Sequence, residues 1–110
     1  MDLIINNDDD CEKIKDNTWK SITVNAGLCN SMIDDLVISN YTHLESIVIM
    51  ADNQNSINTL ANLNSLIIID NPKLQSIVLG EGYWTDSFYG ACVNVNSVQL
   101  ISMTEFEFEI

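Results

Sequence analysis

The fold is decided by a stretch of the chain that occurs twice: Leu36-Val-Ile-Ser-Asn-Tyr-Thr-His-Leu-Glu-Ser-Ile-Val-Ile49 and Leu66-Ile-Ile-Ile-Asp-Asn-Pro-Lys-Leu-Gln-Ser-Ile-Val-Leu79. The second copy begins 30 positions after the first and keeps the same order of apolar and polar residues. An internal period of roughly 20 to 50 residues is typical of proteins that stack similar structural units. We therefore expect a repeat architecture.

The shared skeleton of the repeat is an apolar residue followed by two others at i+3 and i+5. Its starting positions alternate between two classes, at 33, 63 and 95 and at 19, 44 and 74, and Phe106 continues the second class. One unit is therefore about 30 to 32 residues long and holds two strands. The six occurrences are Trp19/Ile22/Val24, Ile33/Leu36/Ile38, Leu44/Ile47/Ile49, Leu63/Leu66/Ile68, Leu74/Ile77/Leu79 and Val95/Val98/Leu100.

The spacing of the apolar residues predicts strands. Residues two apart face one side of a strand, and the residue three earlier is expected to pack beneath the incoming turn. A helix would favour i, i+3, i+4 and i+7, and the β-branched run Ile67-Ile68-Ile69 disfavours helix as well. A single unit cannot bury its inward face alone, so each strand should pair in parallel with its equivalent in the next unit. These features predict an all-β or β-rich solenoid of about three stacked coils, with two parallel sheets and little helix.

The segment Leu63-Asn-Ser-Leu66-Ile-Ile68-Ile-Asp-Asn71 matches the leucine-rich-repeat consensus L-x-x-L-x-L-x-x-N. Together with Leu74-Gln-Ser-Ile-Val-Leu-Gly-Glu-Gly-Tyr83, it resembles the bacterial-surface-antigen type of leucine-rich repeat found in gut bacteria and protists. The resemblance covers roughly residues 19 to 105. It implies a solenoid that binds a protein or a surface, and it brings no catalytic residue. Because other residues stand at the asparagine position of most units, we expect no continuous asparagine ladder.

The chain is expected to form one domain with two parts, an acidic segment or cap over residues 1–18 and the solenoid over residues 19–110. The first part matches no repeat, so it either caps the stack with a polar face or is disordered. Its three consecutive aspartates, Asp8 to Asp10, favour disorder. At the other end Phe106-Glu-Phe-Glu-Ile110 alternates as a half-exposed strand does, and its glutamates should discourage pairing at an open edge.

Charge and hydropathy exclude several classes of partner. The chain has 16 acidic and 4 basic residues and a formal charge of −12, which repels nucleic-acid phosphates and anionic lipid headgroups. No apolar run approaches the roughly 18 residues of a spanning helix, and no basic region precedes the apolar residues near Met1. We therefore expect neither nucleic-acid nor membrane binding, with the cytoplasm as the default compartment.

Residues able to carry chemistry do not form a recognisable constellation. Cys11, Cys29 and Cys92 are odd in number and lack CxxC spacing, so we expect small buried hydrophobes rather than a disulfide framework or a zinc site. The single histidine, His43, precedes Leu44 at a corner and is expected to be a surface turn residue. No nucleotide, metal or cofactor motif is present, and the sequence predicts a protein that is not an enzyme.

Two groups of residues are candidates for binding a partner. The outward positions between the inward ones are Val37 and Ile67 in one strand class and Val48 and Val78 in the other, which predicts an apolar stripe on each sheet. The longest connection contains Tyr83, Trp84, Phe88 and Tyr89, and aromatic residues are frequent binding anchors. The resemblance implies that Phe88 points into the core, which leaves Tyr83, Trp84 and Tyr89 as candidates.

Our leading hypothesis is a non-catalytic protein-interaction scaffold for a protein partner of unknown identity, with self-association through exposed strand edges also open. One alternative is a fragment of a cell-surface adhesin or receptor that binds protein or glycan. Another is a carbohydrate-active enzyme on a parallel β-helix, which needs carboxylates at equivalent cleft positions. The central units offer only Asp34, Asp35 and Glu45, without acidic partners in the neighbouring repeat, and this disfavours the enzyme.

Overall fold

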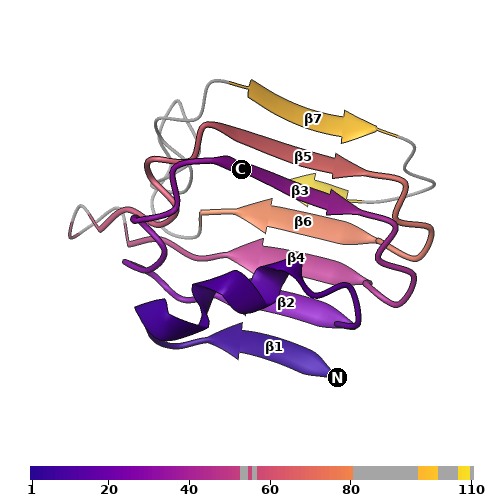
Figure 1. Cartoon of the computed structure of the whole chain (residues 1–110), viewed down its shortest axis with the longest axis horizontal. Coiled ribbons are helices and arrows are strands. Elements are labelled where there is room, and N and C mark those ends of the chain that lie inside the picture. Colours follow the sequence, from indigo (N-terminus) through magenta and orange to yellow (C-terminus); the bar gives the residue numbers. More distant parts are fainter. Residues whose placement is uncertain (53–54, 56, 81–96, 102–106, 110) are drawn as a thin grey trace.

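The computed structural model describes residues 1–52, 55, 57–80, 97–101 and 107–109 of the chain (Figure 1). Within these residues strands dominate, and the only helix is a 3-10 helix, η1. No described helix has the length and apolar character needed to span a membrane. The elements in chain order are β1 (Asp2–Ile5), η1 (Asp8–Lys15), β2 (Ser21–Val24), β3 (Asp35–Ser39), β4 (Ser46–Ile49), β5 (Ser65–Ile69), β6 (Ser76–Leu79), β7 (Ser97–Ile101) and β8 (Glu107–Glu109).

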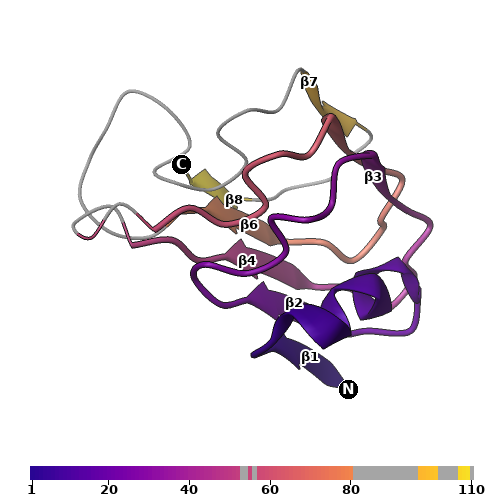
Figure 2. The same ribbon diagram turned by 60° about the vertical axis from the view of Figure 1, so that its left-hand side comes forward.

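The strands form two sheets, in which every neighbouring pair is parallel. One sheet has five strands in the order β1-β2-β4-β6-β8, and the other has three in the order β3-β5-β7. Figure 2 shows the strands of each sheet following one another away from the N-terminal end of the molecule. The predicted β-rich fold with parallel sheets and little helix is therefore confirmed.

The pairing register follows the spacing of the sequence. Ile47 pairs with Ile77 between β4 and β6, and Leu36 pairs with Leu66 between β3 and β5. Strand β8 departs from the prediction by one position, because Ile77 pairs with Phe108. An alignment of Phe106 with Leu74 would have placed Glu109 there. That alignment was wrong, and the difference matters because a shift of one residue exchanges the two faces of a strand.

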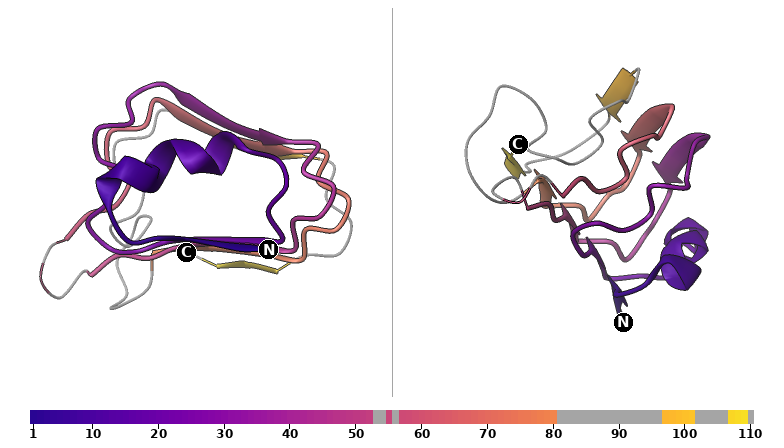
Figure 3. Two further views of the ribbon diagram at one scale, coloured as in Figure 1. Left: turned by 60° about the horizontal axis from the view of Figure 1, so that its bottom comes forward. Right: turned by 90° about the vertical axis from the view of Figure 1, so that its left-hand side faces the viewer.

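The core lies between the two sheets, and η1 crosses one end of it (Figure 3). Alternate residues of β1 to β6 point inward, and burying such aliphatic side chains is the main favourable term in folding, roughly 1.5–3 kcal/mol for each fully buried one. Fully buried large side chains among the described residues include Ile5, Ile14, Ile22, Leu36, Ile38, Leu44, Ile47, Ile49, Leu60, Leu63, Leu66, Ile68, Ile77 and Leu79.

The first residues of the chain are structured, so the interpretation of this segment as disordered was wrong. Strand β1 extends the five-stranded sheet, and its Leu3 and Ile5 are buried. Asn7 caps η1, and the aspartates that favoured disorder occupy the first turn of η1. Carboxylates are stabilised there because the N–H groups at the start of a helix lack intrahelical partners.

Ile33 also departs from the prediction that it packs beneath a turn. Its side chain is 64% exposed, although Leu63, the residue 30 positions later, is buried. The difference follows from position in the sheet: β3 has a strand neighbour on one side only, and η1 lies on the other. Among the residues of η1, only Cys11 and Ile14 are buried, so η1 does not cover Ile33 as a strand would.

Asn71 holds two successive corners together. Its side chain is 1% exposed, and its Oδ1 accepts a hydrogen bond from the Tyr41 backbone N–H at 2.9 Å. Its Nδ2 donates to the Ile38 carbonyl, also at 2.9 Å. The residues before each corner, Asn40 and Asp70, adopt positive φ angles of 60° and 55°, which asparagine and aspartate tolerate better than most residues.

Replacing Asn71 with alanine should lower the free energy of unfolding by about 2–4 kcal/mol, because a buried N–H and a buried carbonyl each lose their partner. Urea denaturation of the wild-type and variant proteins measures this change. Asn17→Ala is the matched control, since Asn17 is exposed. Equal stability of the Asn71 variant and the wild type would show that these two hydrogen bonds do not hold the corners together.

Candidate interaction surfaces

The outer face of the three-stranded sheet carries an apolar pair. Val37 on β3 and Ile67 on β5 are paired in register, and both occupy outward positions. Val37 is 47% exposed, while Ile67 is partly buried. Gln99 of β7 pairs with Ile67, so the apolar residues of this row end at β5. We call Val37 and Ile67 the β3–β5 pair.

The outer face of the five-stranded sheet carries a longer row. Val48 of β4 pairs with Val78 of β6, and the row continues through Thr23 of β2 to Ile4 of β1, which is 56% exposed. We call Ile4, Thr23, Val48 and Val78 the β1–β6 row. Sequence reasoning missed Ile4 because residues 1–18 matched no repeat. The alternation of buried Leu3 and Ile5 with Ile4 was the signal that could have found it.

The aromatic candidates Tyr83, Trp84 and Tyr89 lie outside the described residues, as does Phe88, which was assigned to the core. Their roles therefore stay predictions. The other four candidates, Val37, Val48, Ile67 and Val78, are brought together only in pairs, one pair on each sheet.

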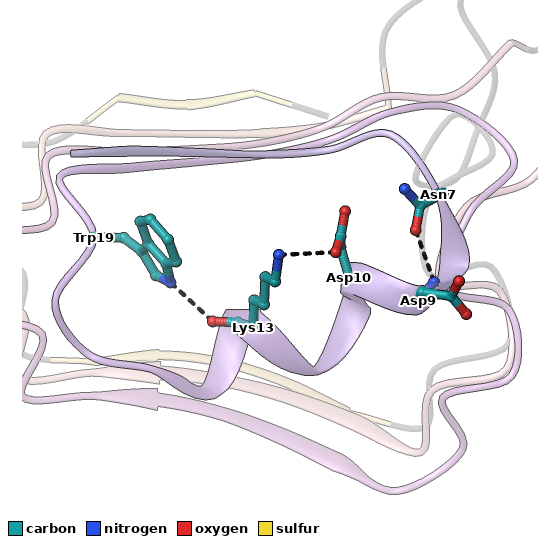
Figure 4. A network of polar contacts seen from close by, with 5 residues as sticks. All are labelled: Asn7, Asp9, Asp10, Lys13 and Trp19. Carbon is teal, nitrogen blue, oxygen red and sulfur yellow. Dashed lines mark hydrogen bonds and ion pairs between the residues drawn. The ribbon is translucent and has the colours of Figure 1, made fainter.

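Polar contacts hold η1 across the end of the core, and several of them appear in Figure 4. At its start, the side-chain oxygen of Asn7 accepts a hydrogen bond from the Asp9 N–H at 3.0 Å. Within it, the Lys13 ammonium lies 2.9 Å from the Asp10 carboxylate. Near its end, the indole Nε1 of Trp19 donates to the Lys13 carbonyl at 2.8 Å. The Trp19 ring is partly buried and packs against the core.

A disulfide between Cys11 of η1 and Cys29, in the connection after β2, adds a covalent link. Both cysteines are buried, as expected, but the expectation that they take no part in a disulfide was wrong; Cys92 lies outside the described residues. An odd cysteine count gives no information about which two meet, and they meet because η1 crosses over the connection that follows β2. The Asp8 carboxylate accepts a hydrogen bond from the Cys29 N–H at 2.8 Å. Although Asp8, Cys11 and Cys29 cluster as metal ligands would, disulfide sulfurs are not the thiolates that bind metal ions.

Tyr41 links η1 to the corner between β3 and β4. It stands 30 positions before Asn71, and its buried hydroxyl donates a hydrogen bond to the Ile14 carbonyl at 2.7 Å. Burial raises the pKa of the Tyr41 hydroxyl, and the nearby Asp16 carboxylate raises it further. The neutral form, which can donate this hydrogen bond, is therefore favoured in the folded protein.

A hollow of about 210 Å³ lies between η1 and the start of β3. The Lys15 ammonium is 2.8 Å from the Glu12 carboxylate, and this interaction raises the pKa of Lys15. Hydrogen bonds from Ser65 and then Asn64 lower the pKa of Asp35, with the Asn64 Nδ2 at 2.7 Å from its carboxylate. The hollow is lined by Asp8, Cys11, Glu12, Lys15, Ser31, Met32, Ile33, Asp34, Asp35 and Leu63.

His43 is an exposed turn residue, as predicted. It borders a shallow corner together with Thr18 and Lys73, which occupy similar positions in the neighbouring turns. Lys20 and Glu45 at the same corner form a loose ion pair at 3.8 Å. None of these five side chains is buried, so the corner offers no site shielded from water.

Comparisons with known proteins give no relative for this chain: no family model matches it, and neither a curated protein nor a solved structure is significantly similar to it. Function therefore has to be inferred from the residues and their geometry.

Reduction of the Cys11–Cys29 disulfide should lower the free energy of unfolding by about 3 kcal/mol, because the bond closes a loop with a sequence separation of 18 residues in the unfolded chain. Urea denaturation with and without a phosphine reductant measures the change. A Cys92→Ser background prevents thiol exchange, and a Cys11→Ser/Cys29→Ser variant should not respond to the reductant. An unchanged midpoint in the parent protein would mean that the bond does not constrain its unfolded state.

Replacing Tyr41 with phenylalanine should cost about 1–2 kcal/mol at neutral pH, because the Ile14 carbonyl loses its buried donor. Since the folded pKa of Tyr41 is raised, its contribution is complete below the pKa of the unfolded chain and is lost as the pH rises through the folded value. The stability difference between the two proteins should therefore shrink above about pH 10. Parallel denaturation curves at several pH values measure it, and a constant difference would contradict the burial of an ionisable hydroxyl.

Proposed function

We propose that this chain is a leucine-rich-repeat-like solenoid that serves as a non-catalytic protein-interaction scaffold. In this proposal, two strands form each coil, successive coils stack in parallel, and the outer faces of both sheets are available to a protein partner. The partner contacts the β3–β5 pair, the β1–β6 row, or both.

The repeat register supports the solenoid part of the proposal. Ser46, Ile47 and Val48 pair with Ser76, Ile77 and Val78, so like residues stack over like residues. The asparagine at the end of the consensus, Asn71, is buried and binds the backbone of the preceding corner. Such a residue satisfies backbone groups that a tight corner cannot pair with one another.

The observation that carries the binding part is the in-register alignment of apolar side chains on outward positions. Large aliphatic side chains at outward strand positions are not stabilised by contact with water. Contiguous exposed apolar residues therefore often mark interaction sites. Val37 and Ile4 are 47% and 56% exposed, and each adjoins a β-branched residue on the next strand. Aliphatic area of this kind contributes to binding when a partner removes it from water.

A second candidate, a cell-surface adhesin or receptor fragment, is favoured by the Cys11–Cys29 disulfide. Disulfides persist in oxidising environments and are rare where thiols are kept reduced. Alkylation of thiols in intact cells before lysis, followed by mass spectrometry, distinguishes the two settings. Alkylated Cys11 and Cys29 would favour the scaffold in a reducing compartment, whereas an intact disulfide would favour the exported fragment.

Replacing Val48 and Val78 together with threonine should reduce partner binding at least several-fold and leave the fold intact, because both side chains point outward and are only partly buried. Proteins captured from cells of the source organism by the wild type and by the variant are compared by quantitative mass spectrometry. Light scattering over a concentration series tests self-association with the same variants.

Ser46→Thr/Ser76→Thr is the matched control, since these two residues form the neighbouring outward row on the same strands. A genuine partner is retained by the wild type and the control and lost from the valine variant. If every captured protein binds all three equally, and Val37→Thr/Ile67→Thr changes nothing either, the outer faces are not the interaction surface.

A further inference from the structure

We propose that the hollow between η1 and β3 binds a lysine or arginine side chain of a protein partner, together with an aliphatic residue beside it in the partner's sequence. This inference rests on the proposed function and specifies the chemistry of the partner. It concerns a different surface from the outer faces of the sheets, so the two can be tested separately.

The shape and apolar lining of the hollow suit the aliphatic part of such a ligand. Its volume of about 210 Å³ is large enough for one or two side chains rather than for a drug-sized molecule. Ile33 is 64% exposed in its wall, where Met32 and the buried Leu63 add apolar surface. A lysine or arginine stem can lie along such a surface while its charged head stays near the rim.

The charges around the hollow select a cation. Four carboxylates line it against the single ammonium of Lys15, and Glu12 already holds that ammonium at 2.8 Å. The Asp8 carboxylate accepts a hydrogen bond from the Cys29 N–H, and the Asp35 carboxylate accepts one from the Asn64 side-chain amide. Asp34 is exposed, and among the described residues its carboxylate makes no direct hydrogen bond or close ion pair; it attracts the Lys15 ammonium less than Glu12 does, and so contributes to the raised pKa of Lys15 while still open to an incoming cation.

The arrangement of the carboxylates suits an organic cation better than a metal ion. Calcium needs six to eight oxygen ligands that converge on one point. Among the described residues, no three carboxylates of the hollow gather within 4.8 Å, and the only such cluster contains the two disulfide sulfurs. A negative potential spread over a hollow with an apolar wall matches a guanidinium or ammonium group carried on a hydrocarbon stem.

The position of the hollow extends the β3–β5 pair. Ile33 and Asp34 directly precede β3, and Val37 lies three residues beyond Asp34 on the same edge strand. A partner segment resting on Val37 can therefore reach Ile33 and Asp34 within a few residues of its own chain. The formal charge of −12 would also steer a basic partner toward this protein.

The proposal is tested by titrating the ¹³C-methyl-labelled protein with an end-blocked peptide that alternates leucine and lysine. Its twin, in which glutamine replaces lysine, is the peptide control. We expect the lysine peptide to shift the methyl signals of Ile33, Met32 and Leu63 with a dissociation constant near or below about 1 mM. The glutamine twin should shift them much less.

Asp34→Asn should weaken the lysine peptide about three- to fivefold, the effect of losing one exposed ion pair. Asp70→Asn is the matched control, since it removes the same charge from an exposed corner where asparagine tolerates the positive φ. It should change the affinity less than twofold. Ile33→Ser should also weaken binding, and its methyl spectrum checks that the fold is retained.

If the Asp34 and Asp70 substitutions weaken binding of the lysine peptide equally, the effect comes from net charge alone and the proposal is overturned. The proposal is also overturned if the peptide does not shift the methyl signals of Ile33. If the peptide shifts only Val37 and Ile67, the hollow is excluded while the outer face stands as the binding surface. If the peptide binds the hollow and the valine variants retain every captured protein, the proposed use of the outer faces fails and the hollow remains.

Discussion

The structure depends on one constraint, the burial of inward side chains that are stacked between parallel strands at a fixed spacing. Ile47 lies beside Ile77, and Leu36 beside Leu66, and all four are almost completely buried. A slip of one residue in either pair would bring outward residues, among them the polar Asp35 or Ser46, into the core and turn the isoleucines or leucines outward. The orientation of every outward residue, including the apolar ones discussed as binding surfaces, is fixed by this stacking.

Tyr41 and Asn71 occupy equivalent positions in successive corners, but their side chains bind different partners. Asn71 uses its amide to bind the corner that precedes it, where Tyr41 occupies the equivalent place. The Tyr41 hydroxyl reaches instead to the Ile14 carbonyl in η1, beyond the first strand of the three-stranded sheet. The longer tyrosine side chain therefore contacts η1 at the end of the sheet, where Asn71 contacts the preceding corner. The same end is held a second time by the bond between Cys11 and Cys29.

The sequence was sufficient for most of the sheet architecture because strand period and repeat spacing are both visible in it. The assignment of Ile38 and Ile49 to different sheets needed only the alternation of two spacings. The sequence was insufficient at the ends, where the repeat gives no template. The disulfide, the exposure of Ile33 and the register of β8 each depend on what lies beside the terminal strands, and no local pattern carries that information. The hollow was missed for the same reason, because it forms between η1 and β3 and belongs to neither alone.

The distance along the chain between paired strands has a consequence for how the protein folds. From β3 and β4 onward, each strand pairs with one that begins about 30 residues later, as Ser46 pairs with Ser76 and Asp35 with Ser65, so closing each of these pairs carries a similar loop entropy. The pairs β1–β2 and β2–β4 are closer in sequence, because Asp2 pairs with Ser21 and Ser21 with Ser46. The mean sequence separation between contacting residues is then set by the length of the sequence repeat. A longer array of such units would have the same separation, so we expect its topology not to slow folding further. The end tied by Cys11 and Cys29 has a shorter link, of 18 residues, and is therefore the natural place for assembly to begin in an oxidised chain.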